Sequence, residues 1–554
     1  MPETATRPHA LQEVVADLER RQVTRKLFDR DGSAWSDDPA EQAEIARWLG
    51  WLPVVDEMQA QVGALHEFAR EVVSDGVEHV VLLGMGGSSL APIVFDGVFG
   101  AAPEFPRLIV IDTTDPEAIR RADEALDPEK SLFVVSSKSG STIEPNVLAD
   151  YFWQRAGKDG RRFVAITDKD TSLSKLAGQR AYRRVFTNRS DIGGRYSALS
   201  YFGLVPAALI GVDVGALLQS ATNAISKTRG ALDKDNQGAW LGAQLAAFAK
   251  EGRDKITFVV APELASLGLW LEQLIAESTG KRGTGLIPVA REELGEPSVY
   301  GDDRVFVSIE INGQPLQDAA RLTELGAAGH PVIVHTLGDV DSLGAEMVNW
   351  EVATAVASSA LGLNPFNQPN VQESKDNTSQ LLEQLESAGA LPVLRDAVRH
   401  GALTIYGAKT EDPVQALNDV FSTLKAGSYM ALMAYLAETP ERQIRLDRLR
   451  LMIRDRTHVA TTFGYGPRFL HSTGQLHKGG PANAAFLQLT ATAGEDLSIP
   501  GRRFTFGQLK AAQALGDFDA LKSRGRPILS IDLGEDVEEA LEELIGLCEE
   551  ALGS

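Results

Sequence analysis

Short apolar runs alternate with helix-length segments through the first two thirds of the chain. Each run ends in small or polar residues, and the runs lie at 79–84, 107–112, 132–137, 162–167, 255–261, 305–311 and 331–336. Such alternation is typical of parallel, doubly wound sheets flanked by helices. We therefore predict an α/β fold that uses this architecture twice.

Segments without this alternation flank the two series. Residues 1–60 are amphipathic and rich in Leu, Glu and Arg, which predicts helices that cap the fold, and 213–250 is predicted to be a mainly helical connector. Beyond residue 400 we expect a helical stretch over 413–456 and an acidic amphipathic helix at the C-terminus. Short strands are expected at 404–407, 486–491 and 527–534.

The C-terminal part echoes an earlier segment. The order strand, helix, GHPVIVHTLGDVDSLGAE (ending at 346) resembles the order strand, helix, GRPILSIDLGEDVEEALEE (ending at 543). Both last strands are entered through Gly-X-Pro. Two interpretations remain open, a duplicated unit and the grammar that all βαβ units share.

Charge and composition exclude several classes of protein. A formal net charge of -22 over 554 residues repels polyanions, which argues against a nucleic-acid partner. The single cysteine, Cys548, excludes an intramolecular disulfide and a cysteine-based zinc site. The N-terminus has no secretory pattern, and the longest apolar stretch is interrupted by Pro206 and Asp213, so we expect neither export nor a membrane span, and a cytoplasmic location.

Glycines and serines follow the first predicted strand. Gly84, Gly86 and Gly87 come directly after it, and Ser88 and Ser89 lead into a helix. Glycines let the backbone approach an anion, and a helix N-terminus offers free N–H groups. A dinucleotide site and a plain turn are the competing interpretations of this loop.

The dinucleotide interpretation rests on two further features. The spacing Gly84-X-Gly86-X-X-Ser89 approximates the Rossmann fingerprint, and Asp112 ends the next strand where a ribose-binding acid would lie.

A second loop favours phosphate over a dinucleotide. It follows another strand of the same predicted sheet and contains five hydroxyls and one ammonium within seven residues: Ser136, Ser137, Lys138, Ser139, Ser141 and Thr142. Open α/β sheets bind ligands at the ends of neighbouring strands, so two such loops predict a pocket for a terminal phosphate.

One carboxylate is placed for chemistry. Trp270, Leu274 and Glu277 share one face of a helix that ends near Gly280, so Glu277 should be partly desolvated, as suits a general base. The alternative is an exposed glutamate at a helix end.

Other candidates lie in three segments. Arg195 follows the glycine turn of DIGGRYS and can stabilise a developing negative oxygen, or it is a surface arginine. Gln368 precedes a proline, and Lys375 on the following helix is more often a snorkelling lysine than a catalytic one. His471 and His477 lie among glycines in LHSTGQLHKGG and are candidate proton shuttles; their spacing does not suggest a metal site.

Taken together, these segments resemble phosphoglucose isomerase. The matching pieces are GMGGSSL, SSKSGSTIE, DIGGRYS, ESTGK, NPFNQPNVQESK and LHSTGQ, from residue 84 to 475. The likeness is greatest to the isomerase part of bacterial fused transaldolase–phosphoglucose isomerase proteins. It implies two sugar-isomerase domains, which we place at 61–225 and 226–400, between a helical segment at 1–60 and an α/β segment at 401–554 that carries the histidine loop.

The resemblance also implies a reaction and its residues. The reaction is the interconversion of glucose 6-phosphate and fructose 6-phosphate in glycolysis and gluconeogenesis, without a cofactor or metal, through a cis-enediol. Glu277 matches the base, Arg195 the arginine that steadies the intermediate, His471 and Lys375 the groups that assist ring opening, and Gln368 a residue of the pocket. The residues that match the sugar-phosphate loops are Gly87, Ser88, Ser137, Lys138, Ser139 and Thr142.

The chain departs from the family pattern in two places. LHSTGQ lies about a hundred residues after NPFNQPNVQESK, whereas the histidine segment usually comes first, so His477 competes with His471 for the ring-opening role. A duplicated unit would explain the new position. Asn367 stands where many relatives carry Asp, with little expected consequence for the chemistry.

The resemblance further implies a homodimer with the active site near the subunit boundary. The histidine of each site then comes either from the same chain as the base or from the partner chain. A sensor that binds a sugar phosphate without turning it over is the alternative function, but a sensor would not need a base, an arginine and ring-opening groups.

Overall fold

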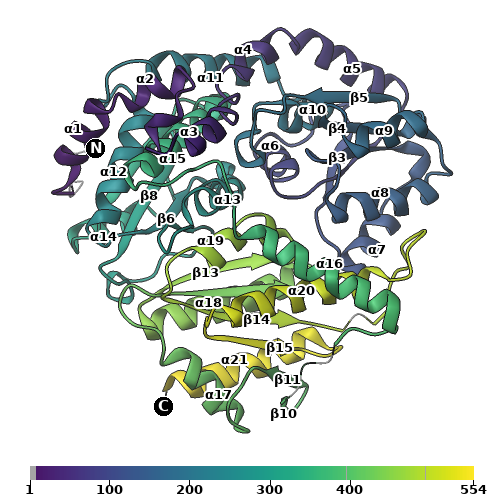
Figure 1. Ribbon diagram of the computed structural model, residues 1–554, viewed down its shortest axis with the longest axis vertical. Helices are drawn as coiled ribbons and strands as arrows, with labels where there is room; N and C mark the ends of the chain where they lie inside the picture. The colour runs from purple at the N-terminus through teal and green to yellow at the C-terminus, as the bar shows by residue number, and fades with distance from the viewer. Residues whose placement is uncertain (1–7, 393, 395, 493, 554) are drawn as a thin grey trace.

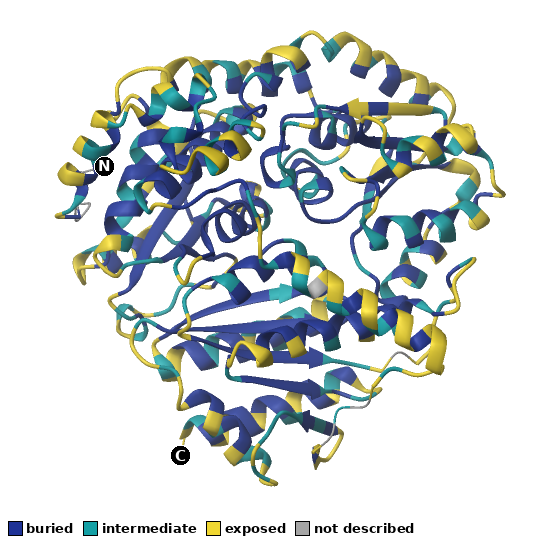
Figure 2. Cartoon of the chain, viewed as in Figure 1, coloured by how far each residue is buried: buried dark blue, intermediate teal, exposed yellow. Residues whose placement is uncertain are grey.

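The computed structural model describes residues 8–392, 394, 396–492 and 494–553. Within them three β-sheets lie around a common centre, the first and second side by side and the third across both (Figure 1). Most strands are buried, whereas the edge strand β5 (Arg184–Asn188) is partly exposed, and the other exposed residues lie mainly on the outer helices and loops (Figure 2).

The N-terminal part is helical, as its pattern predicts. Its helices are α1 (Leu11–Arg20), α2 (Val23–Phe28), α3 (Pro39–Ala46) and α4 (Val54–Gln59). Helix α1 packs against the helices of the second sheet, and α4 packs against α11, so this segment covers the fold.

The first sheet has five parallel strands in the order β2-β1-β3-β4-β5. They are β1 (His79–Leu83), β2 (Arg107–Ile111), β3 (Ser131–Ser136), β4 (Phe163–Asp168) and β5 (Arg184–Asn188). The helices around it are α5 (Val62–Ser74), α6 (Leu90–Phe99), α7 (Pro116–Glu124), α8 (Ile143–Arg155), α9 (Ser172–Gln179) and α10 (Tyr201–Leu209). Alternate residues of β1 enter two different cores: Val80 packs with α5, α6 and α10, and Val81 packs with α7, α8 and α9. The sheet is therefore covered on both faces, as a near-continuous apolar strand requires.

The second sheet has four parallel strands in the order β7-β6-β8-β9. They are β6 (Lys255–Val260), β7 (Ile287–Val289), β8 (Arg304–Ile311) and β9 (Val332–Leu337). Its helices are α11 (Val214–Thr228), α12 (Gln237–Lys250), α13 (Leu267–Thr279), α14 (Ala319–Ala327) and α15 (Leu343–Ala360). Two parallel doubly wound sheets are present, as predicted.

The third sheet corrects one prediction. Residues 413–456 are not one helical stretch, because the strand β12 (Tyr429–Tyr435) separates α17 (Pro413–Phe421) from α18 (Pro440–Thr457). All seven residues of β12 are buried between neighbouring strands. The run YMALMAY has no alternation and contains good helix formers, so its burial in a sheet overrides its local preference.

With β12, the C-terminal part forms a six-stranded sheet in the order β10-β11-β15-β14-β12-β13. The other strands are β10 (Val398–His400), β11 (Leu403–Tyr406), β13 (Ala460–Tyr465), β14 (Ala484–Thr490) and β15 (Ile528–Asp532). The helices that accompany it are α16 (Val371–Ala388), α19 (Gly474–Gly479), α20 (Phe506–Ser523) and α21 (Val537–Gly553). Strands β10 and β11 are antiparallel additions to four parallel strands.

Those four strands have the topology of the second sheet. The order β13-β12-β14-β15 corresponds strand for strand to β7-β6-β8-β9, with α18 in the place of α13 and α20 in that of α14. The Gly-X-Pro entries also match: Phe306 N donates to Pro331 O and Phe486 N donates to Pro527 O, both at 2.9 Å. This correspondence supports the duplication hypothesis over a chance echo. It assigns the histidine segment to the connection between β13 and β14.

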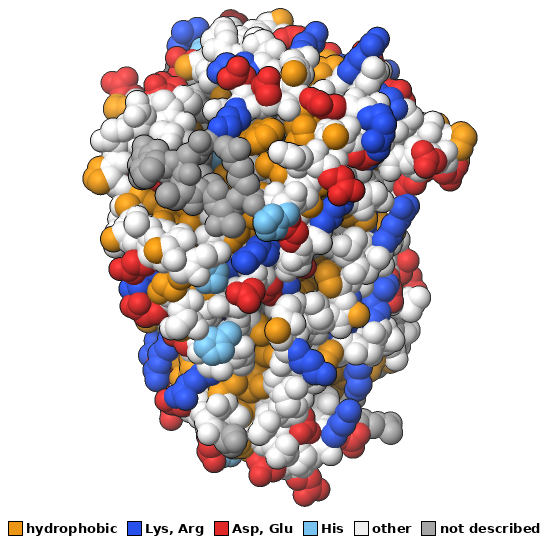
Figure 3. All heavy atoms as spheres, turned by 90° about the vertical axis from the view of Figure 1, so that its left-hand side faces the viewer, with side chains coloured by type: hydrophobic (Ala, Val, Ile, Leu, Met, Phe, Trp, Pro, Cys, Tyr) orange, Lys and Arg blue, Asp and Glu red, His pale blue; other side chains and the backbone are white. Residues whose placement is uncertain are grey.

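No helix among the described residues is both long and apolar enough to span a bilayer. On the face shown in Figure 3, acidic and basic side chains are interspersed rather than gathered into one basic patch.

Candidate active site

Four connections from the three sheets meet at the centre of the molecule. They are η2 (Gly86–Ser88) after β1, η5 (Gly194–Tyr196) after β5, the C-terminal end of α13, and η9 (Arg468–His471) after β13. Every candidate base, arginine and glycine-rich loop predicted from the sequence lies on one of these connections or next to one. The site is therefore built from all three sheets.

The two predicted phosphate loops lie at neighbouring strand ends. Strands β1 and β3 pair in parallel, so the loops that follow Leu83 and Ser136 leave the same edge of the first sheet. Gly87 packs directly on η5, where a Cβ would lie 2.1 Å from the carbonyl oxygen of Gly194. Only glycine fits at this contact. Ser88, next to it, is 8% exposed.

The serine-rich loop presents its hydroxyls close together. Ser137 Oγ lies 3.5 Å from Thr142 Oγ1, and Ser139 Oγ lies 2.9 Å from Ser141 Oγ. Lys138 is oriented differently, because its Nζ lies 2.5 Å from Asp168 Oδ2 at the end of β4. This carboxylate neutralises the ammonium, so the hydroxyls are the groups of the loop that remain for an anion.

Glu277 is buried, not exposed at a helix end. It is 9% exposed in the last turn of α13, with Trp270 and Leu274 buried on the same helix. Its Oε1 lies 3.3 Å from Arg195 Nη1, and its Oε2 accepts a hydrogen bond of 3.3 Å from Gln273 Nε2. The carboxylate is thus sheltered and paired on both oxygens.

Arg195 is held from several directions. Its guanidinium donates to Ser278 Oγ at 2.9 Å, to the carbonyl oxygens of Pro365 at 2.6 Å and Asn367 at 2.9 Å, and to Gln368 Oε1 at 3.1 Å. At 3% exposure it is no surface arginine. The structure therefore brings Arg195 and Gln368 together with Glu277.

His471 reaches the first sheet. Its Nε2 lies 2.9 Å from Oε1 of Glu144, the glutamate of the STIE motif at the start of α8. Gln513 Nε2 donates to the same carboxylate oxygen at 2.8 Å. Burial raises the pKa of Glu144, but the charge and hydrogen bond of His471 outweigh burial, and the pKa lies below its ordinary value. The carboxylate is therefore ionised near neutral pH and can orient the imidazole.

Lys375 lies close enough to contribute its charge. It is exposed on α16, and its positive charge helps to lower the pKa of Glu144. His477 has a different environment. It is 3% exposed, packs against the rings of Tyr429, Phe469 and Phe486, and neither ring nitrogen has a hydrogen-bond partner. Between the two candidates, His471 is the one that the structure places at the site.

Two functional residues were missed by the sequence reasoning. Glu144 lies within a quoted motif, but its partner is 327 positions away, so only the fold reveals the pair. Gln273 could have been found, because it precedes Glu277 by four residues on the same helix. Its Nε2 also donates to the carbonyl oxygen of His471 at 2.7 Å, so it links the base to the histidine turn.

The acid that the dinucleotide interpretation requires is already paired. Asp112 is 2% exposed and forms a two-pronged ion pair with Arg468, at 2.7 and 2.8 Å. A ribose would have to displace this arginine from a buried carboxylate, which argues against a dinucleotide in this position. Among the described residues, no group of three or more histidine, cysteine and acidic side chains is arranged to hold a metal ion.

The arrangement suits a proton transfer on a small anionic ligand. A sheltered carboxylate, an arginine that stays charged, and an imidazole held by a second carboxylate lie on segments that contact the glycine-rich turn after β1. Such groups can remove a proton, stabilise the negative oxygen that results, and move a second proton.

Comparison with known proteins points to the same family as the sequence motifs. Residues 52–302 match the phosphoglucose isomerase family, a range that includes Gly87, Arg195 and Glu277 but ends before Gln368 and His471. The glucose-6-phosphate isomerase of Rubrobacter xylanophilus is 29% identical over 373 residues, which cover 56% of this chain and 83% of that one. That of Prochlorococcus marinus (strain NATL2A) is 26% identical over 428 residues, which cover 68% and 80%.

Solved structures share the fold. A hypothetical protein of Thermus thermophilus superposes with a TM-score of 0.55 at 25% identity, over 67% of this chain and 96% of that one. A glucose-6-phosphate isomerase of Chlamydia trachomatis also superposes with a TM-score of 0.55, at 19% identity, over 68% and 86%. Over residues 52–302 the chain is therefore similar to the phosphoglucose isomerase family, and the curated relatives that it matches are glucose-6-phosphate isomerases.

Proposed function

We propose that the chain interconverts glucose 6-phosphate and fructose 6-phosphate, a step of glycolysis and gluconeogenesis, by moving a proton between C2 and C1 through a cis-enediol. The observation that carries this proposal is the buried Glu277 carboxylate, 3.3 Å from a buried arginine and on a helix that contacts the glycine-rich turn η2. A sugar phosphate seated on the glycine- and hydroxyl-rich loops would present its reacting carbons to this carboxylate.

In this proposal Glu277 removes the proton from one carbon and returns it to the other. Gln273 limits the motion of the carboxylate by its hydrogen bond to Oε2. As the proton leaves, negative charge develops on the substrate oxygen, and Arg195 stabilises it without changing its own protonation. Gln368, bonded to Arg195, completes that side of the pocket.

Hydroxyls and backbone groups hold the phosphate. We assign this role to Gly87, Ser88, Ser137, Ser139 and Thr142, whose loops share one edge of the first sheet. Lys138 belongs to the same loop, but its charge is already balanced by Asp168, so we expect its contribution to be the smallest.

His471 and Lys375 assist ring opening. An ionised carboxylate can only accept hydrogen bonds, so Nε2–H of His471 donates to Glu144 and Nδ1 keeps its lone pair. That nitrogen can take a proton from a ring hydroxyl and return it, which is the role we propose. Lys375 adds positive charge on the same side.

Each chain carries a complete set of these groups in our proposal. The contact between His471 and Glu144 lies within one chain, so the third sheet supplies the histidine in cis. The homodimer, the cytoplasmic location and the cofactor-free reaction remain predictions. We keep the four-part division at 1–60, 61–225, 226–400 and 401–554 as a proposal.

The test is turnover of fructose 6-phosphate by dialysed protein without added dinucleotide or metal, followed by the same assay on Glu277→Gln. We expect the wild type to form glucose 6-phosphate and the variant to lose turnover while fructose 6-phosphate still raises its thermal midpoint. Binding without turnover in the wild type would favour the sensor. Unfolding of the variant, with loss of binding, would make Glu277 structural.

A further inference from the structure

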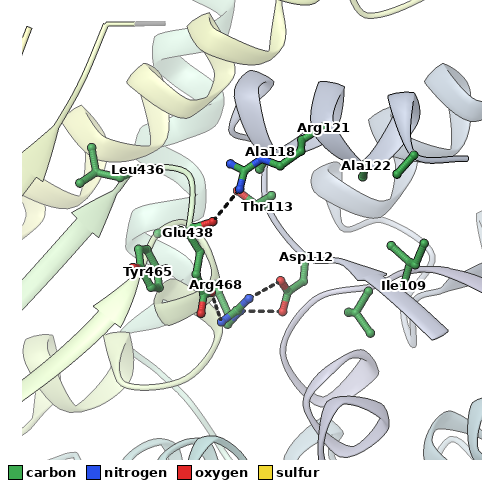
Figure 4. A pocket seen from close by; sticks show the side chains of 13 residues that line it. Ile109, Asp112, Thr113, Ala118, Arg121, Ala122, Leu436, Glu438, Tyr465 and Arg468 are labelled. Carbon is green, nitrogen blue, oxygen red and sulfur yellow. Dashed lines mark hydrogen bonds and ion pairs between the residues drawn. The ribbon is translucent and has the colours of Figure 1, made fainter. Parts of the chain in front are cut away.

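Arg468 begins the turn that carries His471. It is the first residue of η9 and precedes His471 by three positions. Its Nε lies 2.7 Å from Asp112 Oδ2 and its Nη2 lies 2.8 Å from Asp112 Oδ1, so the guanidinium grips the carboxylate with two parallel bonds (Figure 4). Such a pair fixes direction as well as distance.

The partner carboxylate belongs to the first sheet and to its phosphate loop. Asp112 directly follows β2 and is 2% exposed. Its Oδ2 also accepts a hydrogen bond of 3.2 Å from Ser89 Oγ, and Ser89 directly follows η2. One buried carboxylate therefore joins the loop that we assign to the phosphate and the turn that carries the histidine.

Two neighbours contact the backbone and Cβ of His471. A Cβ placed on Gly86 of η2 would lie 3.0 Å from both the Cβ and the carbonyl oxygen of His471. Gln273 holds that same carbonyl oxygen from α13. Arg468 supplies a further anchor, on the side that faces β2.

We propose that Arg468 and Asp112 are a positioning pair that holds His471 against Glu144, an inference that rests on the proposed isomerase function. The histidine comes from a connection of the third sheet, while Glu144 and the phosphate loops belong to the first sheet. The position of the imidazole therefore depends on how the two sheets are held together at this turn.

The pair acts on the rate more than on binding. Without the guanidinium, η9 can pivot about its other anchors, and a catalytic group displaced by about 1 Å costs on the order of 100-fold in rate. Ser89 keeps its bond to Asp112 when only Arg468 is replaced, so the phosphate loop stays in place. We expect kcat to fall and KM to change little.

The chain offers a matched control. Arg442 on α18 also crosses from the third sheet to the first, with Nη1 2.8 Å from Glu117 Oε2, and it also bonds Glu538 Oε1 at 2.9 Å. Arg442 is 7% exposed, and among the described residues its guanidinium bonds to Glu117, Glu538 and the carbonyl oxygen of Ala437 rather than to η9. Arg442→Ala thus removes an ion pair between the same two parts of the molecule without releasing the histidine turn.

The experiment compares Arg468→Ala with Arg442→Ala in kcat, KM and thermal midpoint. We expect both midpoints to fall, but kcat to fall about 10- to 100-fold only in Arg468→Ala. Arg468→Lys, which keeps the charge and loses the two-pronged grip, should fall between the wild type and Arg468→Ala. If Arg468→Ala does not fold, the lysine variant carries the comparison.

Chemical rescue separates positioning from folding. A cavity of about 310 Å³ opens beside Asp112 and Arg468, so added guanidinium ion can reach the vacated place in Arg468→Ala. We expect guanidinium at low millimolar concentration to restore part of the lost kcat in that variant and to leave Arg442→Ala unchanged.

A double mutant identifies the target of the pair. In a His471→Ala background, Arg468→Ala should cost little more, because the group that it positions is gone. Three results would each overturn the proposal. They are losses of kcat that multiply in the double mutant, equal effects of Arg468→Ala and Arg442→Ala on kcat, and an effect of Arg468→Ala confined to KM. A wild type without isomerase activity would instead refute the proposed function, so the two failures are distinguishable.

Discussion

Replacing Glu144 by glutamine tests how the histidine is oriented. The amide keeps the shape of the side chain and can still accept from Gln513, but it removes the charge that faces His471 at 2.9 Å. A hydrogen bond to a charged group contributes about 1.5–3 kcal/mol. If that stabilisation is realised as the histidine takes up a proton, kcat should fall about 10- to 150-fold, at 1.4 kcal/mol for each factor of ten.

The control for this variant is a second buried pair of the same kind. Oε1 of Glu346, on α15, lies 3.4 Å from His335 Nδ1 and accepts a hydrogen bond of 2.7 Å from Trp350 Nε1. Burial raises its pKa, but the charge and hydrogen bond of His335 prevail and lower it, as for Glu144. In both cases the stabilisation is present above the ordinary pKa of a glutamate and is lost as the pH falls through the folded value.

The assay measures kcat and KM for fructose 6-phosphate, and the urea midpoint, for Glu144→Gln and Glu346→Gln. We expect both variants to lose stability, and only Glu144→Gln to lose kcat. Equal kcat in wild type and Glu144→Gln would refute the role given to the pair of Glu144 and His471.

Three further substitutions test other parts of the account. His477→Phe should keep kcat within about twofold, because neither nitrogen of its imidazole has a hydrogen-bond partner. In the same steady-state assay kcat of His471→Phe should fall about 10²- to 10⁴-fold. The reverse pattern would make His477 the proton shuttle. Burial raises the pKa of Glu272 to about 7. The wild type therefore loses stability as the pH rises from the ordinary 4.5 through 7, because the carboxyl group must ionise while buried. In urea titrations the free energy of unfolding of Glu272→Gln should rise relative to that of the wild type by up to about 3 kcal/mol between pH 5 and 8. A pH-independent difference would contradict this assignment. Asn367→Asp should raise the thermal midpoint at pH 7. Asn367 Oδ1 lies 3.1 Å from Nζ of Lys281, whose pKa is lowered by burial and then by the charge of Arg195, and a carboxylate at this distance would stabilise the charged lysine. A lower midpoint would show that the added charge is not compensated.

The parts of the site that could be predicted are those that local pattern encodes. The loops after β1 and β3 are glycine- and hydroxyl-rich ends of apolar strands, and their adjacency follows from the rules of parallel sheets. Glu277 follows from helical spacing, since Trp270 and Leu274 mark the buried face of α13. For these residues, the pattern within some ten positions was sufficient.

The parts that could not be predicted depend on contacts between distant segments. The interaction of Glu144 with His471 could not be foreseen from either segment alone. Asp112 was left open to a competing interpretation as a ribose acid because its partner Arg468 lies 356 positions away. The strand β12 was hidden for a related reason: an apolar run without alternation resembles a buried helix until its neighbours in the sheet are known.

The most direct test of the central claim follows the proton itself. Fructose 6-phosphate is incubated in heavy water with wild type or with Glu277→Gln, and deuterium at C1 of the ketose and C2 of the aldose is measured by NMR. We predict that the wild type introduces deuterium at both carbons and that the variant introduces none while still binding the sugar phosphate. Exchange by Glu277→Gln at the wild-type rate would contradict the assignment of Glu277 as the base.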